Sequence, residues 1–159
     1  MNLIWLKFIS ERIFVSKNLS IVLLLCHIFA LIMFARKWVT SVKEECKKAT
    51  NLINDKTSSL NPNYVVSALF VSNFIGISFA RTLHYQFYCW NFHSLPFLLL
   101  STNIPLVGNV FILAAIEYAF NIFPATATSS SLLQVAHMIL LLSLFYAKVP
   151  RAMFKQKAI

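Results

Sequence analysis

Charged residues are scarce in this sequence. Only 12% of its 159 residues are Asp, Glu, Lys or Arg, whereas 58% are hydrophobic and the mean hydropathy is +0.71. The charged share is about half of what is usual in a soluble globular protein, and a soluble fold of this length could not bury so much apolar surface, so lipid is the expected solvent. Between Arg81 and Lys148 the one formally charged residue is Glu117. A bilayer core requires about 20 apolar residues per helical crossing, so this half of the chain predicts membrane-spanning helices.

Cysteines are few and widely separated. Cys26, Cys46 and Cys89 form no Cys-x-x-Cys pair and have no His–Cys cluster, so the sequence predicts neither a disulfide framework nor a metal site, and no other cofactor. A cleavable signal peptide is also not expected. The first 18 residues carry charges throughout and lack a short apolar core followed by small residues.

The basic residues are placed as in a membrane protein. The net charge of +9 suggests nucleic-acid binding at first sight. However, six Lys and Arg lie in 36–64 and four follow residue 147, where apolar stretches end. This is the positive-inside pattern, which places both clusters in the cytosol. Membrane lipid is therefore the expected partner, and nucleic acid is not.

The apolar pattern predicts an all-α membrane protein with about five transmembrane helices in a single domain. The uncharged stretch 82–116 is too long for one crossing, and Pro96 and Pro105 are the expected break points. Four crossings between the basic loop and the basic tail put both on one side of the membrane. The predicted segments are an amphipathic surface segment (1–18), spans at 19–35, 64–80, 105–123 and 131–147, a cytosolic loop (36–63), a luminal motif (81–93), a returning segment (94–104) and a cytosolic tail (148–159).

The chain ends in KQKAI. Lys157 and Lys155 stand third and fifth from the C-terminus, which matches the dilysine pattern for retrieval to the endoplasmic reticulum. The alternative is that they are ordinary basic residues after a last span.

Polar residues are concentrated at 81–96, RTLHYQFYCWNFHSLP. In a membrane protein such density is costly unless it lines a polar site. If 81–92 is helical, one face carries Arg81, His84, Tyr85, Tyr88 and Phe92, and another carries Gln86, Trp90 and His93. A cation beside an imidazole and two phenols suits a phosphate-bearing lipid. An aromatic belt at headgroup depth is the alternative, but it does not account for Arg81, Gln86 and two histidines.

The run FIGISFARTLHYQFYCWNFHSLPFLL resembles the signature of the dolichyl-phosphate-mannose:Man(5)GlcNAc(2)-PP-dolichol alpha-1,3-mannosyltransferases. Similarity extends to SNFIG (72–76), FISERIFVSK (8–17) and IEYAFNIFPAT (116–126), so nearly the whole chain is covered. It corresponds to the C-terminal part of that family, and Asn91 stands where the family usually has an aromatic residue.

This resemblance implies a multi-pass, GT-C-type glycosyltransferase of the endoplasmic-reticulum membrane. Its donor would be dolichyl-phosphate-mannose and its acceptor a lipid-linked oligosaccharide in N-glycosylation. Under that reading Arg81, His84 and His93 neutralise the departing dolichyl phosphate, whereas Tyr85, Gln86 and Trp90 shape the donor and sugar pocket. Stabilising charge on a leaving phosphate is a large term in catalysis.

The acidic residues do not complete an active site. Enzymes that this chain resembles carry a catalytic acid on an early luminal loop. Here Glu117 is expected to be a buried partner for Lys, Arg or His rather than a general base. The other acids also do not fit the role; they are Glu11, Glu44, Glu45 and Asp55. No catalytic residue is predicted in this chain, which we expect to be inactive alone. A non-enzymatic membrane subunit and a decayed, inactive copy of the enzyme are the alternatives.

Overall fold

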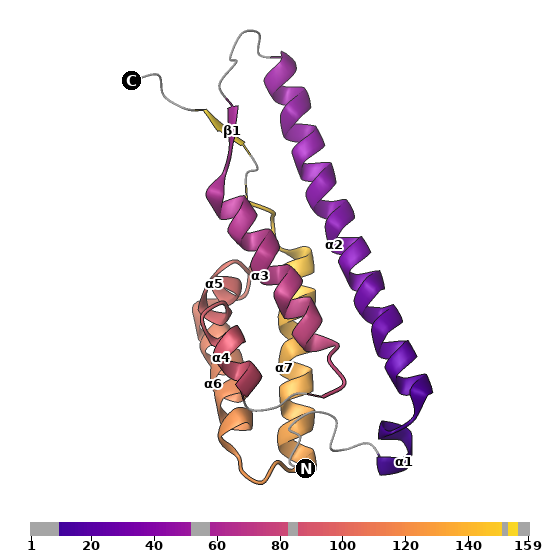
Figure 1. Ribbon diagram of the computed structural model, residues 1–159. Helices are drawn as coiled ribbons and strands as arrows, with labels where there is room; N and C mark the ends of the chain where they lie inside the picture. The colour runs from indigo at the N-terminus through magenta and orange to yellow at the C-terminus, as the bar shows by residue number, and fades with distance from the viewer. Residues whose placement is uncertain (1–9, 52–57, 83–85, 151–152, 156–159) are drawn as a thin grey trace.

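The computed structural model describes residues 10–51, 58–82, 86–150 and 153–155 and shows an elongated helical bundle (Figure 1). The predicted helical class is confirmed, and one short strand pair was not predicted. In chain order the elements are α1 (Glu11–Phe14), α2 (Lys17–Asn51), β1 (Ser58–Leu60), α3 (Pro62–Ser78), α4 (Gln86–Phe92), α5 (Leu95–Leu100), α6 (Leu106–Asn121), α7 (Ala127–Tyr146) and β2 (Met153–Lys155).

The longest helix, α2, continues past the end of the span predicted at 19–35. No Gly or Pro interrupts the sequence between Lys17 and Asn51, so nothing breaks the ladder of backbone hydrogen bonds. Its 35 residues give a length of about 50 Å, more than the roughly 30 Å of a bilayer's hydrocarbon core. The segment predicted as a loop from residue 36 therefore begins as helix.

The core lies between α3, α5, α6 and α7. The side chains of Phe74, Leu98, Ile116 and Leu140, one from each helix, have no exposed surface. His137 of α7 is also fully buried, and its ring stacks on Phe74 with centroids 5.2 Å apart and planes 8° apart. Close packing of these four helices provides the rigid frame on which the remaining elements are placed.

The long apolar stretch 82–116 breaks where its prolines predict. Pro96 lies in the first turn of α5, and Pro105 is the residue before α6. The turn between these helices is held by Asn109, whose Nδ2 donates a hydrogen bond to the carbonyl of Leu99 (3.0 Å) and whose Oδ1 accepts one from Thr102 Oγ1 (3.2 Å). The Asn109 side chain thus supplies a hydrogen-bond donor to a backbone carbonyl that the break leaves without a helical partner. Within a membrane every backbone polar group requires such a partner.

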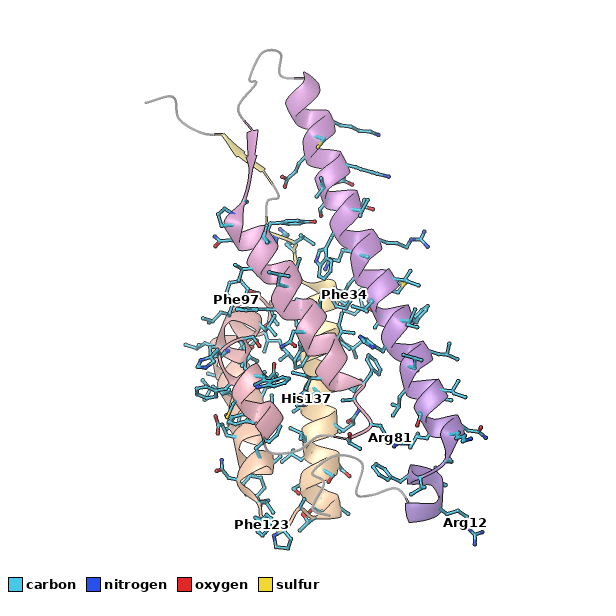
Figure 2. All side chains as sticks on the ribbon, in the orientation of Figure 1. Arg12, Phe34, Arg81, Phe97, Phe123 and His137 are labelled. Atoms are coloured by element: carbon cyan, nitrogen blue, oxygen red, sulfur yellow. The ribbon has the colours of Figure 1, made fainter. Side chains whose placement is uncertain are left out.

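Helix α2 is attached to the bundle mainly at its middle. Phe34 is buried and points into the bundle (Figure 2), with its ring 5.4 Å from that of Phe145 in α7. Lys37 Nζ donates hydrogen bonds to the carbonyls of Leu144 (3.2 Å), Phe145 and Ala147 (2.6 Å). On the opposite side of α2 the apolar side chains remain exposed.

The two strands pair antiparallel, with Ser58 opposite Lys155 and Leu60 opposite Met153. They connect the segment before α3 to the segment after α7. The pair lies at the end of the bundle where α2 finishes, opposite the end that carries α1 (Figure 1).

Within the described ranges, two helices are long and apolar enough to cross a membrane. They are the Lys17–Lys47 part of α2 and all of α7, Ala127–Tyr146, judged by length and composition. Helix α6 is apolar but shorter. The count of about five spans stays a prediction.

Candidate functional site

Arg81, the first residue of the polar motif, contacts the N-terminal part of the chain. Its Nη1 donates a hydrogen bond to Ser20 Oγ of α2 (2.7 Å), and its guanidinium carbon lies 5.8 Å from the centroid of the Phe14 ring in α1. The side chain is exposed, at the α1 end of the bundle (Figure 2). Arginine has five N–H donors in a fork, so a guanidinium in this setting retains donors for a phosphate.

The condition that 81–92 is helical is not met at Arg81 and Thr82. Helix α3 ends at Ser78, the amide of Phe79 donates to the carbonyl of Ile75 (3.2 Å), and Arg81 and Thr82 are not helical. The chain reverses direction between α3 and the pair α4–α5 (Figure 1), and a reversal requires non-helical residues. Arg81 therefore lies on a turn rather than on the face of α4.

Three of the predicted site residues are not placed. His84 and Tyr85 lie outside the described residues, and of Gln86 the backbone alone is described, as the first residue of α4. Their proposed roles stay predictions.

Tyr88 fixes α4 to α6. Its hydroxyl donates a hydrogen bond to Glu117 Oε1, and its ring lies 4.6 Å from that of Phe120 and 5.4 Å from that of Phe92. The last contact confirms the predicted shared face of Tyr88 and Phe92. Burial and the hydrogen bond to Glu117 raise the pKa of Tyr88 well above its ordinary value, because both favour the neutral phenol.

Among the described residues, no Lys, Arg or His is paired with Glu117, although the sequence predicts a cationic partner. In the part of the chain that the structure describes, its carboxylate accepts from Tyr88 and, at 3.4 Å, from Asn121 Nδ2, which also donates to the Glu117 carbonyl (2.7 Å). The Tyr88 hydroxyl and the Asn121 amide thus stabilise the charge of the Glu117 carboxylate. That Glu117 is not a general base stays a prediction.

Trp90 lies on the outer side of α4, and His93 follows directly after this helix. Trp90 is 70% exposed, and His93 is exposed with its ring edge-on to Phe92 at 5.7 Å. Both rings are therefore accessible to a ligand or to lipid.

Sequence reasoning missed a buried polar pair beneath the motif. Asn91 is 1% exposed and Ser94 is 2% exposed. Ser94 Oγ donates to the Asn91 carbonyl (2.8 Å) and lies 3.0 Å from Asn91 Oδ1. This pair closes the turn between α4 and α5. The spacing of the two residues gives a weak signal, since Asn and Ser commonly bond to backbone near turns.

A sequence profile of the family described as "ALG3 protein" matches residues 3–130. That range covers most of the chain and includes the whole motif and its partner Glu117. The chain belongs to the ALG3 protein family. Within this ALG3 family member the match extends from the segment before α1 into the first turn of α7.

Similar curated proteins carry one activity in their names. A probable Dol-P-Man:Man(5)GlcNAc(2)-PP-Dol alpha-1,3-mannosyltransferase of Dictyostelium discoideum is 39% identical over 145 residues, covering 88% of this chain and 32% of the relative. The enzyme of that name from Arabidopsis thaliana is 40% identical over 162 residues (89% and 35%). The one from Homo sapiens is 35% identical over 154 residues (91% and 34%).

The chain spans about a third of the length of these relatives. No solved structure matches it significantly.

Proposed function

We propose that this chain forms the C-terminal part of an endoplasmic-reticulum mannosyltransferase. The enzyme would transfer mannose in alpha-1,3 linkage from dolichyl-phosphate-mannose to Man(5)GlcNAc(2)-PP-dolichol, for protein N-glycosylation. The observation that carries the proposal is the shared name of the relatives, which states donor, acceptor and linkage. The polar run 81–96 lies inside the matched range and supports the same conclusion.

The proposed donor site lies along this run. Arg81 is exposed and positively charged, and its contacts with Ser20 and Phe14 hold the guanidinium at the α1 end of the bundle. With His84 and His93 it would neutralise the dolichyl phosphate as the mannosyl bond breaks. Tyr85, Gln86 and Trp90 would shape the donor and sugar pocket. The Tyr88–Glu117 contact supports this role for the run because it fixes α4 to the core.

The proposed topology has about five spans, with the motif in the lumen and both basic segments in the cytosol. The β1–β2 pair supports placing the loop and the tail on one side of the membrane, since paired strands cannot be separated by a bilayer. Arg81 lies at the opposite end of the bundle (Figure 2). Lys155 and Lys157 would then act in retrieval from the cytosolic side.

The test is complementation in cells that lack the alpha-1,3-mannosyltransferase, with profiling of their lipid-linked oligosaccharides. We expect the chain alone to leave the five-mannose intermediate unchanged, and the chain with the remaining two-thirds of a relative supplied in trans to extend it. Extension by the chain alone would show that it is a complete enzyme. No extension under either condition, despite stable membrane expression, would favour the non-enzymatic subunit or the decayed copy.

Substitutions in the motif test whether its residues take part directly in mannose transfer. In the complemented enzyme we expect His84→Ala and Arg81→Gln to abolish transfer, because each removes a group that stabilises charge on the leaving phosphate. Arg12→Gln is the matched control, since Arg12 is an exposed arginine near the same end of the bundle (Figure 2). Unchanged turnover in His84→Ala would contradict the proposed roles.

A further inference from the structure

A groove runs between α2 and α7 on one side of the bundle. It encloses about 550 Å³ and is lined by apolar side chains, among them Phe29, Ala30 and Phe34 from α2 and Met138, Leu141 and Phe145 from α7. This volume lies within the usual range for ligand pockets, about 300–1,000 Å³. Both walls belong to the two helices that are long enough to span a membrane, so the groove lies at the depth of lipid chains.

The shape and the lining of the groove suit a hydrocarbon chain. A single acyl chain is thin, and the methionine and phenylalanine walls can adapt to it.

One end of the groove is basic. Lys37 Nζ lies 5.6 Å from the centroid of the Phe145 ring, which forms part of the groove wall. A small pocket continues from this point and shares Phe34 with the groove, and it is lined by Lys37, Trp38 and Lys148. Among the described residues, neither lining includes an Asp or a Glu.

The two lysines differ in what they can offer a ligand. The three carbonyls at the end of α7 take up the three N–H donors of Lys37. Lys148 is exposed directly after them, and Trp38 is of the residue type that gathers at headgroup depth. An apolar groove that ends in cations between helices is the pattern of an anionic-lipid site.

We propose that the groove binds one acyl chain of an anionic glycerophospholipid, whose phosphate lies beside Lys148. This site is separate from the proposed donor site at Arg81, which lies toward the α1 end of the bundle (Figure 2). The proposal therefore does not depend on the chain acting as a mannosyltransferase.

The test is native mass spectrometry of the chain, purified in detergent and delipidated, with phosphatidylglycerol or phosphatidylcholine added. We expect the one-to-one adduct with phosphatidylglycerol to be about fivefold more abundant, as one basic residue near a lipid surface contributes about that factor. Lys148→Gln should remove this preference. Ala30→Phe, which fills the groove, should reduce both adducts at least tenfold.

Ala114→Phe is the matched control, because Ala114 is exposed on α6 and does not line the groove. It should bind both lipids as the unmodified chain does. Equal binding of the two lipids, or full binding in Ala30→Phe, would overturn the proposal. Loss of the adduct in Arg81→Gln rather than Lys148→Gln would overturn it as well, by placing the phosphate at the other end. Detection of a lipid-free dimer of the chain in place of the lipid adduct would also overturn the proposal.

A second measurement avoids any effect of Ala30→Phe on folding. In a Trp5→Phe, Trp90→Phe background, Trp38 is the one remaining tryptophan. In bilayers of brominated phosphatidylcholine its fluorescence is quenched. Adding unbrominated phosphatidylglycerol at a tenth of the lipid should restore much more than a tenth of the signal. Recovery in simple proportion to the amount added would mean that no anionic lipid is selected.

Discussion

Lys37 ties the middle of α2 to the end of α7, and its removal should destabilise the chain measurably. Its ammonium group donates to three carbonyls at the C-terminus of α7, where a positive charge also interacts favourably with the helix dipole. In Lys37→Met the apolar stem is kept and the charge is lost.

The size of the effect follows from these contacts. A hydrogen bond to a charged group contributes about 1.5–3 kcal/mol, and a cation at a helix C-terminus up to about 2 kcal/mol. The freed carbonyls lie near the helix end and can be hydrated, so the contributions do not add fully. We expect a loss of about 2–3 kcal/mol in the free energy of unfolding. For a chain of this length that lowers Tm by roughly 5–10 °C.

The assay is thermal unfolding of the purified chain in detergent, followed by circular dichroism. Lys43→Met is the control, since Lys43 is an exposed lysine of the same helix and none of the described contacts involves it. If the two variants have Tm values within 1 °C of each other, the three carbonyl contacts do not hold α2 to the bundle.

Two further predictions concern Tyr88 and the helix glycines. Tyr88→Phe should lower the free energy of unfolding by about 1–2 kcal/mol, because the Glu117 carboxylate loses a donor. The raised pKa of Tyr88 predicts that its stabilising contribution is complete below the ordinary tyrosine pKa of about 10 and is lost only as pH rises through the higher folded value. In an ultraviolet titration Tyr88 should therefore ionise last among the tyrosines. The increase in tyrosinate absorbance at the highest pH should then be absent in Tyr88→Phe. A Cβ on Gly108 would lie 2.6 Å from Ile104 Cγ2, whereas one on Gly76 would meet its nearest neighbour at 3.9 Å. Gly76→Ala should raise Tm, because alanine is favoured over glycine in a helix by about 1 kcal/mol, and Gly108→Ala should lower it; the same direction in both variants would contradict this.

The helices themselves could be predicted from the sequence to a large extent. Long uncharged stretches gave the helical class, and Pro96 and Pro105 gave the breaks around α5 and α6. The charges at Arg36 and Lys37 predicted where a span ends but not where the helix ends. Leaving a membrane does not stop a helix, and the residues up to Asn51 include neither Gly nor Pro.

Contacts between distant parts of the chain could not be predicted. Arg81 and Ser20 are 61 residues apart, and no pattern in either segment identifies the other. For Glu117, an isolated acid in an apolar helix suggested a cationic partner, but a phenol donates equally well to a carboxylate. The strands β1 and β2 have three residues each, too few for an alternating pattern to be detected.

The attachment of α2 also constrains the order in which the chain can assemble during synthesis. Helices α6 and α7 are neighbours in sequence and pack together, so they can associate as soon as both exist. Lys37, in contrast, must wait for acceptors that begin 107 residues later, at Leu144. At about 5–20 residues per second that delay is roughly 5–20 s. Throughout this interval α2 can pack against α3, which follows it in the chain, but Lys37 has no acceptor from α7. Any factor that recognises a lysine in a membrane helix therefore has time to bind it.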